Sequence, residues 1–316
     1  MSDLPPPPDP DGGRTPPPQP PSVPPPPGGA AAAPGGDPVG DGHVRTDRRT
    51  PLSRVRSPYG LWIATFSVLI FVGPNLAVLA AGGLAEGLET VTRPSTAELI
   101  FSLAVTLVFQ IGIFLAALLP LLAAGRPFRR LFGPTRGTAL MWAVGIGVGV
   151  VTSVVALSIN AGLALLLEAE EPVEQQILQD ALAGGVPLVL AALIAVVAAP
   201  VTEEVIFRGV LFRALTGKFG LWVAAVVSSV VFAVIHFEIV FSQPIALAGL
   251  FAVGMLLALA YHVTGSLLVP VLGHAVFNAV SLSLAIIVDR LGLDELEPVA
   301  VLVVVADRIA SVVAGG

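Results

Sequence analysis

Three short motifs in the C-terminal half of the chain place ionisable side chains inside apolar segments. They are Glu203-Glu204-x-x-x-Arg208, Phe232-x-x-x-His236 and His274-x-x-x-Asn278. An ionisable side chain at membrane depth costs a few kcal/mol or more, so such a residue is a functional candidate by default. Two carboxylates and two histidines can together activate a water molecule. The set therefore indicates hydrolytic chemistry within a membrane.

The two adjacent glutamates cannot both face one partner, because neighbouring residues project about 100° apart on a helix. Glu204 and Arg208 are four residues apart, the spacing at which side chains meet on a helix surface. That pairing would neutralise Glu204 and leave Glu203 free to act as a general base. The alternative is a buried ion pair that holds two helices together, with the second glutamate in water.

The two histidines each have a companion four residues away: Phe232 precedes His236, and Asn278 follows His274. A lone histidine on an apolar helix is more often an ordinary core residue than a catalyst. Two of them, following a double glutamate, favour a site. Asn278 would orient the surroundings of His274 or donate a hydrogen bond to an oxyanion. Phe232 fits ordinary core packing equally well.

The composition predicts a membrane protein. The 316 residues are 55% hydrophobic and only 12% charged, whereas a soluble domain carries about twice that charged fraction. Runs of roughly 20 apolar residues have the length that a membrane-spanning helix needs. We expect an all-α, polytopic transmembrane bundle of about seven or eight spans. The expected apolar runs are 60–81, 98–124, 138–167, 186–202, 219–238, 244–262, 267–288 and a weaker one at 298–315.

The same sequence excludes several classes of site. There are no cysteines, which excludes disulfides, thiolate nucleophiles and cysteine-bound metals. No His-Glu-x-x-His, Gly-x-Ser-x-Gly or phosphate-binding motif occurs, and no basic tract suits nucleic acid beyond the juxtamembrane arginines.

Two parts of the chain are expected to behave differently. Residues 1–56 are predicted to be a disordered Pro/Gly-rich cytoplasmic tail, since sixteen of the 29 prolines lie in residues 1–44 and such a segment buries too little apolar surface to fold. Residues 57–316 are predicted to form the membrane domain, with 186–290 as its catalytic core. The juxtamembrane arginines before the first run place the N-terminus in the cytoplasm; they are Arg45, Arg48, Arg49, Arg54 and Arg56.

Two structural details within the membrane domain follow from small residues and prolines. Segment 143–149 contains a small-xxx-small pair, which would let another helix approach closely. If the helices end where hydropathy suggests, His274 lies about 10 Å and His236 about 25 Å from the cytoplasmic ends of their helices. A shared site then requires tilted or broken helices, and Pro200 and Pro270 are the expected places for breaks.

In this order and within these apolar runs, the three motifs resemble the CPBP family of intramembrane proteases. That family includes the type II CAAX prenyl endopeptidases and the bacterial Abi or bacteriocin-processing homologues. The resemblance covers about residues 186–290, and no position of the three motifs departs from the family pattern. It implies that Glu203 activates water with Glu204 and Arg208 in support. It also implies that His236 and His274 position the water or stabilise the oxyanion, assisted by Asn278.

The resemblance leaves the role of a metal open. Two histidines and a glutamate are the ligand number of a catalytic zinc site, and here the ligands would be Glu203, His236 and His274. A metal-free mechanism with a glutamate-activated water would use the same residues.

We therefore expect a multi-pass endopeptidase of a bacterial inner (plasma) membrane, with its N-terminus in the cytoplasm. Its expected partners are membrane lipids and a peptide or membrane-protein substrate, and not nucleic acid. Two alternatives remain open. One is a non-enzymatic membrane immunity or scaffold protein. The other is a proton- or cation-coupled transporter that uses Glu203, His236 and His274 as a relay.

Overall fold

The computed structural model describes residues 59–86, 95–125, 138–167, 184–236 and 245–293, together with 304, 307, 308, 310 and 311. All of them lie in the second of two units into which the chain divides, Arg48–Gly316. Within these described ranges the regular structure is helical and contains no strand, which confirms the predicted all-α class. The predicted tail, 1–56, and most of the weak apolar run at 298–315 lie outside the described residues.

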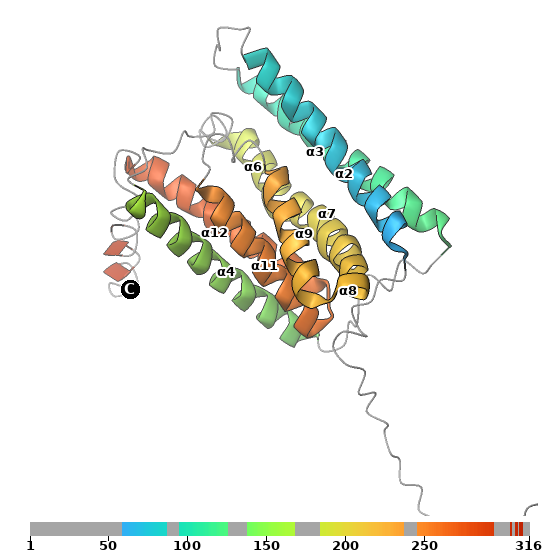
Figure 1. Ribbon diagram of the computed structural model, residues 1–316. Coiled ribbons are helices and arrows are strands. Elements are labelled where there is room, and N and C mark those ends of the chain that lie inside the picture. The colour runs from blue at the N-terminus through green and yellow to red at the C-terminus, as the bar shows by residue number, and fades with distance from the viewer. Residues whose placement is uncertain are drawn as a thin grey trace, which may run out of the picture. The chain divides into compact units, whose positions relative to one another are not determined.

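The helices follow one another in a simple order (Figure 1). They are α2 (Leu61–Glu86), α3 (Thr96–Ala123), α4 (Thr138–Leu166), α6 (Gly185–Leu193), η2 (Ile194–Ala198), α7 (Ala199–Glu204), η3 (Val205–Phe212), α8 (Arg213–Phe219), α9 (Leu221–Ile235), α11 (Ala246–Thr264) and α12 (Leu268–Leu291). The segments from α6 to α8 form one continuous helical stretch, in which η2 and η3 are π-helices.

Five helical segments in the described part of the chain are long and apolar enough to cross a membrane. They are Thr96–Ala123, Ala139–Leu166, Gly185–Phe219, Ala246–Thr264 and Leu268–Leu291. Two shorter apolar helices, Leu61–Ala77 and Leu221–Ile235, accompany them. The protein is a multi-pass membrane protein, and these seven helices agree with the predicted number of spans.

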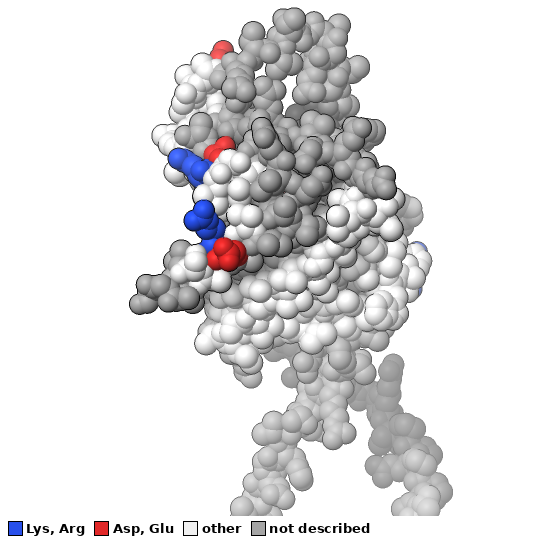
Figure 2. Space-filling model, turned by 90° about the vertical axis from the view of Figure 1, so that its left-hand side faces the viewer, with Lys and Arg blue, Asp and Glu red and all other residues white. Residues whose placement is uncertain are grey.

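The described surface is largely apolar. Large hydrophobic side chains such as Phe101, Val108 and Val189 point outward. Figure 2 shows one face that is white over most of its described area, with a few charged side chains along one edge. An apolar surface of this extent marks contact with a membrane or another protein, and around spanning helices it is the surface that faces lipid.

Glycines let α4 and α12 pack closely. A Cβ atom added at Gly149 would lie 2.5 Å from the Cβ of Val276, and one at Gly145 would lie 2.7 Å from the Cβ of Leu272. Both distances are shorter than real Cβ contacts, so only glycine fits at these two positions. Small residues are the usual means by which membrane helices approach one another. The close approach predicted for segment 143–149 is present.

The fourth apolar run was predicted to end at residue 202, but the helical stretch continues to Phe219. Hydropathy places the end at the first charged residues, as if Glu203 and Glu204 faced water. Both are instead buried inside the bundle, as are Arg208 and Arg213. Charges that are satisfied by neighbouring helices do not end a spanning helix.

Neither proline that was expected to break a helix does so. Pro200 follows the π-helix η2, in which the Ala199 N–H bonds to the Ile194 carbonyl five residues back. The wider π turn accommodates the residue without ending the helix. Pro270 lies in the first turn of α12, where a backbone N–H has no intrahelical partner in any case.

The longer helical stretch also explains how His236 reaches Glu203. Phe219 lies sixteen residues after Glu203, a rise of about 24 Å, and the fifteen residues of α9 rise about 22 Å. Gly220, with φ 83°, is the single residue between the two helices, and α9 packs back against η3. His236, at the C-terminal end of α9, therefore returns to the level of Glu203.

Candidate active site

The two glutamates face different helices. Both are buried, with 7% of Glu203 and none of Glu204 exposed. Glu203 lies 3.9 Å from His236 at the end of α9, whereas Glu204 contacts His274 on α12. The 100° between adjacent helical positions thus gives each carboxylate its own partners.

Glu204 makes two hydrogen bonds within a charged cluster that consists of Glu203, Glu204, Arg208, His236 and His274. Its Oε1 accepts a hydrogen bond from Nη1 of Arg208 at 2.7 Å and another from Nδ1 of His274 at 3.0 Å. Arg208 and Glu204 thus form the ion pair that their spacing predicted, and both are buried. Nη2 of Arg208 donates to the Gly254 carbonyl on α11 at 3.1 Å. One cluster of charge-assisted hydrogen bonds therefore connects α7, η3, α11 and α12.

Phe232 lies at the centre of this cluster. The Arg208 guanidinium lies 4.6 Å from its ring centroid, within the range of a cation–π contact. The ring centroids of His236 and His274 lie 4.8 Å and 5.5 Å from it. Phe232 thus contacts both histidines and the arginine, so it is more than general core packing.

Glu203 and His236 face each other without a direct hydrogen bond. Oε2 of Glu203 is 3.9 Å from Nε2 of His236, and it has no hydrogen-bond partner among the described residues. Nδ1 of His236 lies 2.8 Å from the Phe232 carbonyl. A carbonyl can only accept, so Nδ1 carries the proton, and in the neutral ring Nε2 is an acceptor. Two acceptors separated by 3.9 Å can both accept from one small donor molecule between them.

Asn278 lies one helical turn beyond His274 on α12, and its side chain contacts the backbone of η2. Its Nδ2 donates to the Ala195 carbonyl at 2.6 Å. The structure thus brings five of the six predicted residues into one cluster. The sixth, Asn278, instead donates a hydrogen bond to the backbone of η2. The five are Glu203, Glu204, Arg208, His236 and His274.

Two backbone carbonyls that accept hydrogen bonds at the site could not have been predicted from a sequence motif. The carbonyls of Gly254 and Ala195 accept hydrogen bonds from Arg208 and Asn278. Every residue has a backbone carbonyl, so spacing alone does not show which one is used. Gly254 does contribute through its size, because a Cβ there would lie 2.8 Å from the Cβ of Ser229.

The described residues do not fit a three-ligand metal site. No three His, Asp or Glu side chains among them lie close enough to hold one ion. The described residues form two separate carboxylate–histidine pairs, Glu203 with His236 and Glu204 with His274.

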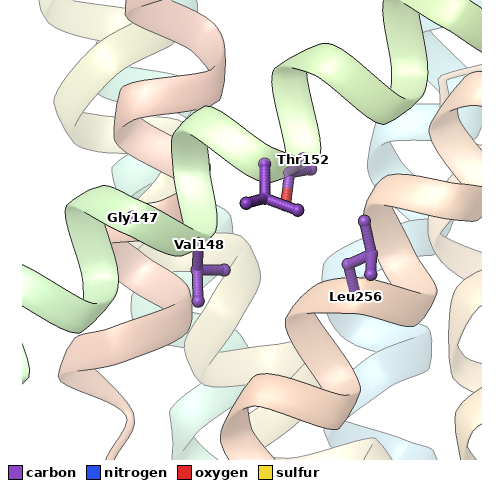
Figure 3. Close-up of a pocket in the computed structure, with 5 residues that line it drawn as sticks. Gly147, Val148, Thr152 and Leu256 are labelled. Carbon is purple, nitrogen blue, oxygen red and sulfur yellow. The ribbon is translucent and has the colours of Figure 1, made fainter.

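A pocket of about 230 Å³ lies between α4 and α11 (Figure 3). Its lining residues are Gly147, Val148, Val151, Thr152 and Leu256. None of the residues of the charged cluster lines it, and it holds no carboxylate or histidine. The pocket is therefore separate from the candidate site.

Comparison with known proteins agrees with the motifs. Residues 185–280 match the family described as Rce1-like, type II CAAX prenyl endopeptidase. The chain is also 28% identical over 215 residues to an Escherichia coli protein described as an uncharacterized 24.3 kDa protein, and the alignment covers 63% of this chain and 89% of that protein. No solved structure matches the chain. Because the matched segment contains all three motifs, the family resemblance that they predicted is confirmed over residues 185–280.

Proposed function

We propose that the protein is an intramembrane endopeptidase in which Glu203 activates the attacking water. The observation that carries the proposal is the pair formed by Glu203 Oε2 and His236 Nε2, two acceptors 3.9 Å apart. A water beside the line that joins these two atoms can donate hydrogen bonds of about 2.8 Å to both of them. The family match supports the reaction class.

The proposed reaction needs one base and one acid, and Glu203 serves as both. Glu203 accepts a proton from the water while the water oxygen attacks the carbonyl carbon of the scissile peptide bond. The resulting tetrahedral intermediate carries an oxyanion. Glu203 then returns the proton to the amide nitrogen, the C–N bond breaks, and a carboxyl and an amine product leave. His236 holds the water through its second hydrogen.

Glu204 supports this reaction indirectly. It holds Arg208 and His274 at 2.7 and 3.0 Å, so their donor groups are fixed before substrate binds. Preorganised donors in a site of low dielectric are an effective means of stabilising an oxyanion. Arg208, whose Nε–H has no hydrogen-bond partner among the described residues, is the residue that we assign to this task.

The proposed setting is a bacterial inner (plasma) membrane with the N-terminus in the cytoplasm. The juxtamembrane arginines favour that orientation, and the apolar outer surface fits a lipid environment. The substrate is a peptide or membrane protein that reaches the buried carboxylates from the cytoplasmic side.

The test replaces the carboxylate of Glu203 with an amide of nearly the same shape. Glu203→Gln is nearly isosteric but cannot accept the proton, so we expect kcat on quenched peptide substrates to fall by about 10²–10⁴-fold. Glu98→Gln is the matched control, because Glu98 is an exposed carboxylate in the capping box of α3, a role that glutamine also fills. Both variants should insert into the membrane and melt like the wild type. Near-wild-type kcat in Glu203→Gln would show that Glu203 is not the base.

A further inference from the structure

Asn278 makes one hydrogen bond that the proposed chemistry does not use. Its Nδ2 donates to the Ala195 carbonyl at 2.6 Å, and this bond joins α12 to the π-helix η2. Four residues earlier on α12, His274 bonds to Glu204. Helix α12 is therefore fastened to the α6–α8 stretch at two points, one on each side of Pro200.

The Ala195 carbonyl needs this donor because the helix itself supplies none. In an α-helical turn its partner would be the N–H of residue 199, but the Ala199 N–H bonds to Ile194 instead. In a π turn its partner would be the N–H of residue 200, which is a proline and has none. Within a membrane no water replaces a missing donor, so backbone groups must be satisfied by protein.

We propose that Asn278 is a positioning residue that takes the place of the missing Pro200 N–H and thereby fixes the rotation of Glu203 and Glu204. A π-helix holds one more residue per hydrogen-bonded turn than an α-helix. If η2 reverted to an α-helix, every residue after it would rotate by about 100° relative to α6. Glu203 and Glu204 begin only three residues after Pro200, so that rotation would turn them away from His236 and His274. This inference rests on the proposed function for its catalytic consequence.

The experiment is a double-mutant cycle between Asn278 and Pro200, measured on the full chain in detergent. Asn278→Leu removes the donor and keeps a similar volume. Pro200→Ala supplies an N–H that can reach the Ala195 carbonyl. We expect Asn278→Leu alone to lower kcat at least 10-fold with little change in KM, because the carboxylates are misplaced while the rest of the site is intact. On the Pro200→Ala background we expect the same substitution to change kcat by less than 2-fold.

A control on the same helix is Ser281→Ala, which removes a hydrogen bond to the Phe277 carbonyl within α12 and should leave kcat unchanged. An Asn278→Leu loss of equal size on both backgrounds would overturn the proposal, and would instead favour an oxyanion donor that acts on substrate directly. Unchanged kcat in Asn278→Leu would overturn it as well. If Pro200→Ala is itself inactive, the Tm values of the same four proteins test the proposal instead. Additive losses of Tm for Asn278→Leu and Pro200→Ala would then overturn it.

The outcomes also separate this inference from the proposed function. If the wild type cleaves no peptide, or if Glu203→Gln retains full activity, the proposed function fails. The Tm cycle between Asn278 and Pro200 still tests the hydrogen bond in that case, because it does not depend on catalysis.

Discussion

Two adjacent glutamates make different contacts because the helix points them at different neighbours. Glu204 Oε1 accepts two charge-assisted hydrogen bonds, which fix its position. Glu203 Oε2 has no partner in the described part of the chain, so it remains available to a substrate or a water. A buried polar atom without a partner requires an explanation, and a catalytic base is one.

We predict that Glu204 and Arg208 are energetically coupled. Removing one partner leaves the other charge buried and unpaired, which costs about 3–5 kcal/mol, whereas removing both removes that penalty. Glu204→Leu and Arg208→Leu should each lower Tm in detergent, and the double variant should lose less than the sum of the two losses. The exposed pair Asp289 and Arg290, 3.9 Å apart, serves as a control in which coupling should be near zero. Additive losses at Glu204 and Arg208 would show that the pair contributes no coupling.

The donor arrangement also predicts the response to chelation. No three His, Asp or Glu side chains among the described residues lie close enough to hold one ion, so we expect activity to survive exhaustive chelation and the purified protein to carry no stoichiometric metal. His236→Ala should still be severely impaired, because it removes one of the two acceptors for the water. Loss of activity on chelation, restored by added zinc, would contradict this expectation and require a rearranged site.

At the scale of the helices, the sequence predicts which residues meet better than it predicts where the helices end. The i, i+4 spacing indicated that Glu204 and Arg208 pair, and the small residues at 143–149 indicated a close helix contact. Both features depend on local geometry alone. The continuation of the helix to Phe219 depends on partners contributed by α11 and α12, which are distant in the sequence. A hydropathy profile therefore ends the span at Glu203.

The π-helix η2 is a second feature that the local sequence does not predict. Pro200 suggested a break, because a proline normally removes one helical hydrogen bond and clashes with the preceding turn. The structure contains a wider turn instead, and the carbonyl left unpaired is satisfied by Asn278. That donor lies 83 residues away in sequence. Local rules cannot show that a distant side chain completes the helix.

We predict that Gly149→Ala disrupts the packing of α4 on α12, while Gly147→Ala does not. A Cβ at Gly149 would lie 2.5 Å from the Val276 Cβ and 2.7 Å from the Gly273 carbonyl, whereas one at Gly147 meets nothing within 4 Å. Overpacking of this kind costs about 1–3 kcal/mol, so Tm should fall for Gly149→Ala alone. Because α12 carries His274, kcat should fall with it. Equal stability of the two variants would show that α4 and α12 are less tightly packed than the structure has them.

In the described part of the molecule, polar residues lie inside and apolar residues lie outside, the reverse of their distribution in a soluble protein. Charged and polar residues such as Glu204, Arg208 and His274 are buried, while large apolar residues such as Phe101 and Val108 face outward. In a bilayer the exposed apolar surface costs nothing, and the interior is the place where charges find partners. The polar interior is therefore both the means of holding the helices together and the location of the candidate site.

The three tryptophans of the chain mark where this molecule should meet the membrane surface. Trp62, Trp142 and Trp222 are 79%, 50% and 65% exposed, and they lie near the starts of α2, α4 and α9. These are the first, third and fifth of the seven helices when the α6–α8 stretch counts as one. If each helix crosses in turn, all three starts lie on the same side. Tryptophan favours the interface, where its ring is buried and its N–H is hydrated.

We therefore predict that the three indole rings lie at one shallow depth in the same leaflet. Single-tryptophan variants, with the other two replaced by phenylalanine, can be compared in bilayers of lipids brominated at different positions along the acyl chain. Quenching should be strongest for the bromine nearest the headgroup in all three variants, because each ring begins a spanning helix. Stronger quenching of any one of them by bromine near the chain end would mean that its helix begins inside the bilayer. For Trp222 in particular, that result would place the start of α9 deeper and move His236 away from the depth of Glu203, so the measurement tests the geometry of the candidate site as well as the topology.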